Sequence, residues 1–240
     1  MIACKTSHDI LAPALHDDRP ARALKGIQNE PLKKLVAEQA NLSAEQLYAQ
    51  HKRLFGPQGV FDQFNADIER LGRQAPALED MTLLAIDERI GHAEQALAFV
   101  LAQNHRRQAC HNPFRGHSRE ALCCVVFDES GLFTMVERYA AYEAMRQSDS
   151  DFFIKLIATT RGVVERRIVF YGLLEHFDRL LPIEQCIYPD NYRQVQQAHL
   201  QREERLYGPL LLDGSLAELL ESVSPLDLLR QVQSHNDGMR

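Results

Sequence analysis

The 240-residue chain lacks any apolar run that approaches the roughly 20 residues needed to cross a bilayer, so no membrane span is expected. It also lacks a basic excess, because 27 Lys and Arg residues stand against 33 Asp and Glu residues, a formal net charge of −6. Nucleic-acid binding through the whole surface is therefore excluded, and it would need a local basic patch. The first 18 residues lack the pattern of a secretory signal peptide.

Cysteine is scarce, and its five copies form no Cys-x-x-Cys pair. Reduced thiols in the cytoplasm are expected. Six potential zinc ligands fall within residues 105–124, namely His105, Cys110, His111, His117, Cys123 and Cys124. Zinc sites usually draw their ligands from closely spaced pairs, so buried thiols beside a solvated His-rich loop are the stronger interpretation. We expect no metal and no other cofactor.

Residue sets typical of catalysis are missing as well. Ser118 lies beside His117 without the context of a nucleophile elbow, and no glycine-rich phosphate loop follows a strand. Glu88 and His92 are four residues apart, but a single pair of this kind is usually surface decoration. The sequence therefore indicates a protein that is not an enzyme.

Helical spacing of apolar residues runs through most of the chain, and an apolar content of 45% is enough for a sizeable core. The expected helices begin at Pro31 and continue with 44–55, 60–72, a long one after Thr82, 135–147, a short one through Ala158, 163–181, one that ends at Tyr207, and two short ones near the C-terminus. Ser43 is a candidate N-cap, and Thr134 with Glu137 has the spacing of a capping box. The residues 148–151 are expected to break the helix that starts at 135.

One short apolar run, residues 122–127, is followed by the turn residues 128–131 and favours a strand. The predicted fold class is mainly α, a helical bundle with one small β element near the middle and a helix-turn-helix subdomain. The predicted domains are a loosely ordered N-terminal arm (1–30), a helical N-terminal domain (31–120), the β element with the helix-turn-helix (121–182) and a C-terminal association region (183–240). The last region is acidic and leucine-rich, which favours a homo-oligomer.

The helix-turn-helix prediction depends on spacing within residues 152–174. Ala158 supplies the small residue at which two helices can cross, and Gly162 follows four positions later, where the turn needs tolerance of positive φ. Ile168 lies six positions beyond that glycine as an apolar anchor of the second helix. Ile154, Ile157 and Val163 are further internal anchors in this interpretation.

A second helix from Val163 would present its N-terminal residues to the major groove of double-stranded DNA. The predicted base or groove contacts are Val164, Glu165, Arg166 and Arg167. The predicted phosphate contacts are Lys155 and Arg161 near the motif, with Arg115 and Arg119 in the basic loop before residue 120.

A family resemblance supports the same interpretation. The run 133–145, with Glu137, then Ala141 and Tyr142, resembles the helix that precedes the helix-turn-helix of ParB-type partition proteins, and Leu181-Pro182 resembles the close of that motif. The resemblance covers about a fifth of the chain and implies DNA binding as a dimer, in partition or regulation. That family also carries a Gly-Glu-Arg-Arg type nucleotide-binding signature, which is missing here, so nucleotide binding is not implied.

The favoured function is therefore sequence-specific DNA binding in transcription regulation or in partition of a plasmid or mobile element. The alternative is a non-enzymatic helical adaptor in which the same two helices form core. Residues 134–182 contain seven acidic and seven basic residues, so the module itself is neutral. Exposure separates the two: DNA binding requires Arg166 and Arg167 on the surface, whereas burial of that helix favours the adaptor.

Overall fold

The computed structural model describes residues 30–105, 110–159 and 165–237, and these residues form helices and loops without a strand. The predicted N-terminal arm lies outside these ranges, except for Glu30. The helices are α2 (Glu30–Ala40), α3 (Ala44–Phe55), α4 (Val60–Leu71), the 3-10 helices η1 (Gly72–Gln74) and η2 (Pro76–Leu83), α5 (Asp87–His105), α6 (Arg119–Val126), α7 (Met135–Ala158), α8 (Glu165–Arg179), α9 (Pro182–Gln185), α10 (Tyr192–Tyr207), α11 (Leu216–Ser222) and α12 (Pro225–Asp237). Within the described ranges, none of these helices combines the length and hydropathy that a membrane span requires.

Helix ends follow local signals in the sequence. The Gln46 backbone N–H donates to Ser43 Oγ at 3.3 Å, and the Ser43 N–H donates to the Gln46 side chain at 2.8 Å, which makes a capping box at the start of α3. Thr134 and Glu137 form a second box at the start of α7. α10 ends at Gly208, whose φ of 85° is available to glycine at little strain. These predicted boundaries are confirmed.

The predicted β element is wrong, because residues 122–126 belong to helix α6. Ser118 caps this helix: its Oγ accepts a hydrogen bond from the Ala121 N–H at 3.2 Å. α6 packs on α7 on one side and on α2 on another, so it buries side chains around more than one face. Those buried side chains are Leu122, Cys123, Val125 and Val126. A short run of this kind does not distinguish a buried helix from a buried strand by its periodicity.

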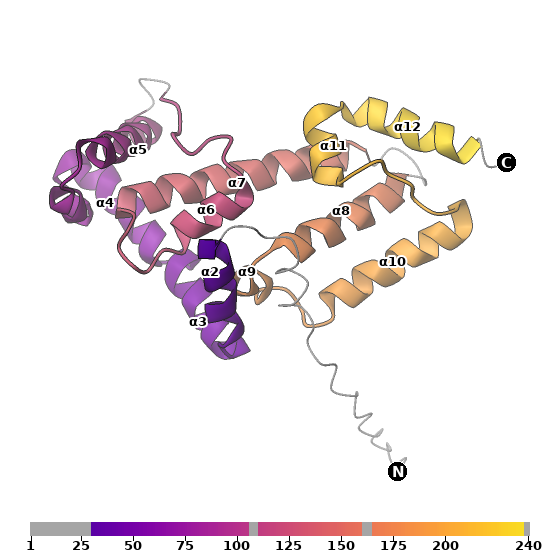
Figure 1. Cartoon of the computed structure of the whole chain (residues 1–240), viewed down its shortest axis with the longest axis horizontal. Coiled ribbons are helices and arrows are strands. Elements are labelled where there is room, and N and C mark those ends of the chain that lie inside the picture. The colour runs from indigo at the N-terminus through magenta and orange to yellow at the C-terminus, as the bar shows by residue number, and fades with distance from the viewer. Residues whose placement is uncertain (1–29, 106–109, 160–164, 238–240) are drawn as a thin grey trace, which may run out of the picture.

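The predicted break within residues 148–151 is also wrong. α7 is one helix of 24 residues, and Ser148 and Ser150 lie on its exposed side. Figure 1 shows α7 extending from beside α5 to the region of α11. Because Met145 belongs to one hydrophobic cluster and Leu156 to another, α7 joins two parts of the molecule.

We call these parts the N-terminal lobe and the C-terminal lobe. The core of the N-terminal lobe draws on α2 to α6, the first half of α7, and Leu181 and Ile183 around α9. The smaller core of the C-terminal lobe draws on the end of α7 and on α8, α11 and α12. Its buried members are Leu156, Ile168, Leu216, Leu220, Leu228, Leu229 and Val232.

Helix α8 is the central helix of the C-terminal lobe. It packs against α7, α10 and α11 (Figure 1), and from Arg167 to Phe177 every residue is buried or half-buried. At Gly172 the backbone of α8 lies close to side chains of α7 and α11. A Cβ added there would lie 2.7 Å from a methyl of Leu156 and 2.9 Å from a methyl of Leu216. Both leucines are themselves buried, so neither can turn outward to make room.

Replacing Gly172 by Ala should therefore destabilise the protein, although alanine is the better helix former. We expect a net loss of about 1 kcal/mol, because overpacking of roughly 1–3 kcal/mol exceeds the roughly 1 kcal/mol gained in helix propensity. Gly91→Ala is the matched control: Gly91 is exposed in α5, nothing lies within 4 Å of its added Cβ, and stability should rise. Urea denaturation of both variants measures this, and equal gains at the two sites would contradict the packing of α8.

Candidate functional site

Arg167, the central residue of the predicted DNA contact, is fully buried at 0% exposure. Its Nη1 donates to three backbone carbonyls at the end of α10, those of Tyr207 at 3.1 Å, Gly208 at 2.5 Å and Pro209 at 3.3 Å. The guanidinium therefore caps the carboxyl end of α10, where carbonyls lack partners within the helix. The predicted groove contact of Arg167 is corrected, since this side chain holds two helices together.

Lys155 and Arg119, two of the predicted phosphate contacts, form hydrogen bonds or ion pairs with other parts of the chain. Lys155 Nζ donates to the carbonyl of Leu220 at 2.9 Å and so joins α7 to α11. Arg119 lies between the carboxylates of Asp149 and Glu184, with 11% of its side chain exposed. The burial and the two ion pairs of Arg119 correct its predicted phosphate contact, whereas that of the half-exposed Lys155 stays a prediction.

The predicted internal anchors Ile154 and Ile157 are 64% and 63% exposed on α7, so that expectation is wrong. Of the remaining predicted contacts, Arg115 and Arg166 are exposed. Gly162, Val163, Val164 and Arg161 lie outside the described residues, as does the side chain of Glu165. The helix-turn-helix therefore stays a prediction, because its turn falls within the same gap.

A different surface emerges on α10, whose outward side carries Val195, Ala198, Arg202 and Arg205 at helical spacing. We call Arg202, Arg205 and the exposed Arg166 of α8 the arginine face. Arg166 belongs here because its neighbour Arg167 bonds to the last turn of α10, which puts the first turn of α8 at the same end of the pair.

Leu206, next to Arg205, is 64% exposed, and Tyr207 is 40% exposed. The surface therefore combines charge with apolar area. Sequence reasoning missed this surface. Its signal was the helical spacing of residues 195, 198, 202 and 205, within a helix that was expected to end at Tyr207.

The most buried ionic cluster lies where α6, α7 and α9 meet. Arg119 donates to Asp149 and, at 2.5 Å, to Glu184. Burial alone would lower the pKa of Arg119, but the carboxylates of Glu184 and Asp149 raise it above its usual value. Burial raises the pKa of Glu184, against the opposing effect of Arg119. The cluster keeps Arg119 charged and stabilises the contact between these helices.

A cavity of about 230 Å³ opens beside this cluster, between α2, α6 and the end of α8. Arg119 and Arg179 in its wall are balanced by Glu120 and Asp178. Arg179 pairs with Glu120 at 3.6 Å. Because the charges of the wall cancel, the cavity favours neither an anion nor a cation.

His176 packs near the same cluster, with its ring 4.7 Å from the Phe153 ring and 5.7 Å from the Phe152 ring between centroids. Burial lowers the pKa of His176 to about 4, only partly offset by the nearby carboxylate of Asp149. The imidazole is therefore neutral and serves as an aromatic packing group at neutral pH.

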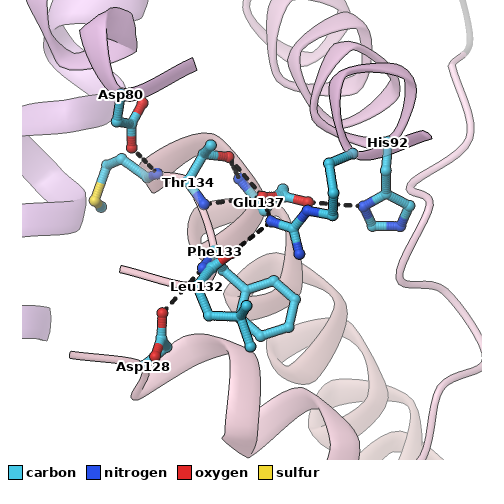
Figure 2. Close-up of polar contacts among 9 residues, drawn as sticks. Asp80, His92, Asp128, Leu132, Phe133, Thr134 and Glu137 are labelled. Carbon is cyan, nitrogen blue, oxygen red and sulfur yellow. Dashed lines mark hydrogen bonds and ion pairs between the residues drawn. The ribbon is translucent and has the colours of Figure 1, made fainter. Parts of the chain in front are cut away.

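A second polar cluster, shown in Figure 2, surrounds Glu137 at the start of α7. Glu137 is fully buried, and its Oε2 accepts from the Thr134 N–H at 2.9 Å, from Thr134 Oγ1 at 2.8 Å and from Arg89 at 2.9 Å. Its Oε1 lies 2.9 Å from His92 Nδ1. Arg89 also donates to the carbonyl of Leu132 at 2.6 Å.

This Glu137 cluster joins α5, α7 and the loop before α7. The loop is held further by two carboxylates in Figure 2, since Asp128 accepts from the Phe133 N–H at 3.0 Å and Asp80 accepts from the Met135 N–H at 2.5 Å. Both Glu137 oxygens are occupied, so its role is to fix these elements in place. His92 therefore contacts Glu137, rather than Glu88 on the surface of its own helix.

The described cysteines are Cys110, Cys123, Cys124 and Cys186, and all four are free thiols. Burial raises the pKa of the Cys123 thiol well above its usual value, so it stays protonated. Across the part of the chain that the structure describes, no three His, Cys, Asp or Glu side chains gather closely enough to hold a metal ion.

Replacing His176 by Phe should flatten the acid limb of the stability curve. The unfolded chain takes up a proton near pH 6.5, whereas the folded chain does so only near pH 4. Stability present above pH 6.5 is therefore lost as the pH falls toward 4, by about 2–3 kcal/mol for this residue. Denaturation of wild type and variant at pH 7 and pH 4 measures the difference, and parallel curves would refute it.

Replacing Glu137 by Gln should destabilise the protein by about 3 kcal/mol, because the half-buried Arg89 loses the carboxylate that it contacts in the interior. Glu143→Gln is the control on the same helix: Glu143 pairs with the exposed Arg146, and its loss should amount to less than about 1 kcal/mol. Urea midpoints of the two variants provide the test. Equal midpoints would show that the Glu137 cluster does not fix α5 against α7.

Comparison with known proteins adds no relative from which a role could be transferred. No family model matches this chain, and no curated protein or solved structure is similar to it. The arginine face, the Arg119 cluster and the Glu137 cluster are therefore interpreted from their own geometry. Of the three, only the arginine face offers charged groups to solvent without partners in the described residues.

Proposed function

We propose that this protein is a non-enzymatic helical adaptor that binds another protein. The observation that carries the proposal is the burial of α8, which exposes no residue between Arg167 and Phe177. A recognition helix must leave its N-terminal half free to enter the major groove. A helix surrounded by α7, α10 and α11 serves as core, which is the arrangement an adaptor requires.

The state of the polar clusters supports a role without catalysis. Glu137 and Arg119 are engaged by neighbouring side chains, and neither is left with a reactive group directed at an open site. The free thiols of the described cysteines support residence in the reducing cytoplasm. The exposed Leu211 (45%) and Leu226 (54%) support self-association of the C-terminal region.

Sequence-specific DNA binding, in regulation or partition, is the second proposal. The exposure of Arg115 and Arg166 supports it, since both belong to the predicted contacts. It would have to operate without Arg167 and Arg119, whose cationic groups bond to other parts of the chain. With so few phosphates neutralised, affinity at physiological salt would be low.

One pair of measurements separates the two proposals. Fluorescence anisotropy with mixed-sequence duplex DNA over a salt series should show no specific binding, and the same protein used as bait should retain a protein that rebinds after purification of both components. Arg166→Ala with Arg115→Ala should leave the anisotropy unchanged. A steep negative slope of log K against log salt that flattens in this double variant would establish DNA binding instead.

A further inference from the structure

We propose that the arginine face binds an acidic amphipathic helix of a partner protein, with Leu206 and Val195 contacting the apolar side of that helix. This inference rests on the proposed adaptor function and names the chemistry of its partner. It follows from where exposed cations without an acidic partner gather among the described residues, most of whose exposed cations are paired.

Most exposed cations that the structure describes have an acidic partner within 4 Å. Examples are Arg53 with Glu129 at 2.6 Å and Arg73 with Glu94 at 2.9 Å. Among the exposed Arg and Lys side chains of the described residues, those without such a partner are Lys52, Arg115, Arg166, Arg202 and Arg205. Three of these five form the arginine face.

The contrast within α10 is the sharpest. Near its start, Arg193 forms a two-point ion pair with Asp178 of α8, at 2.7 and 2.8 Å. Near its end, Arg202 and Arg205 face outward one turn apart, and Arg205 donates only to the carbonyl of Gln201 at 3.2 Å. Within the described residues no carboxylate pairs with Arg202 or Arg205, so both guanidinium groups are open to a carboxylate of a partner.

The geometry fits a helix with carboxylates one turn apart. Arg202 and Arg205 are separated by one helical turn, and arginine can grip a carboxylate with two parallel hydrogen bonds. The third cation, the exposed Arg166, belongs to the first turn of α8, at the same end of the helix pair as Arg205. Leu206 beside the strip gives the partner an apolar contact, and the combination is that of a helix laid along a surface.

An acidic protein fits this surface better than a nucleic acid does. Three arginines neutralise few phosphates, and the net charge of −6 repels a long polyanion away from this face. A short acidic helix meets mainly the local field within a Debye length of about 8 Å. Leu206 would gain nothing from a phosphate but would be buried by a leucine side chain of a protein.

The test uses the full chain and a fluorescein-labelled 20-residue peptide in which a leucine stripe is flanked by glutamates one turn apart. We expect saturable binding that weakens as salt rises and that falls at least tenfold for Arg202→Glu with Arg205→Glu. Leu206→Ser should weaken it several-fold. Lys52→Glu with Arg115→Glu is the control, equal in charge and distant in sequence, and should change binding less than twofold.

The same variants are then applied to any partner reconstituted under the adaptor proposal. A partner that binds wild type and the Arg202/Arg205 variant equally well would overturn the arginine face while leaving the adaptor intact. Peptide binding that the control weakens as strongly would also overturn it, as nonspecific charge attraction. Duplex DNA that binds more tightly than the peptide through the same arginines would replace the acidic protein by a nucleic acid.

Discussion

The contact between Arg167 and the end of α10 is the interaction on which the C-terminal lobe depends. A buried guanidinium is costly unless its donors are satisfied, and here backbone carbonyls accept from it. The end of a helix is the suitable place for this charge, since its last carbonyls lack intrahelical partners and carry negative partial charge. The same contact fixes the register of α8 against α10. In this register Arg193 pairs with Asp178, while Arg202 and Arg205 stay exposed to solvent.

The two lobes share α7, which contributes Met145 to the core of one and Leu156 to the core of the other. The Glu137 cluster fixes the start of α7 to α5, and the Arg119 cluster fixes its middle to α6 and α9. The interaction of Lys155 with Leu220 and the close approach at Gly172 fix its end. Charged groups thus stabilise the joints between elements, while the hydrophobic clusters fill the spaces on either side.

Sequence reasoning succeeded where a few neighbouring residues decide the structure. Ser43, Thr134 with Glu137, and Gly208 mark helix ends because each acts within one turn of its own position. It failed where distant packing decides. The long helix was expected directly after Thr82, yet the Thr82 hydroxyl donates to the carbonyl of Glu79 within η2 and α5 begins at Asp87. The run 122–126 is helical because α7 and α2 cover it from two sides, which no local pattern encodes.

The candidate site shows the same division at the level of single residues. Arg166 and Arg167 are identical in type and adjacent, and spacing alone assigned them the same role. One turns outward and the other caps a helix that begins 25 positions later, at Tyr192. Local sequence could identify α10 as a helix with arginines on one side, but it could not show that Arg193 is paired and Arg202 is not. That difference depends on Asp178 of α8, and hence on the register that Arg167 sets.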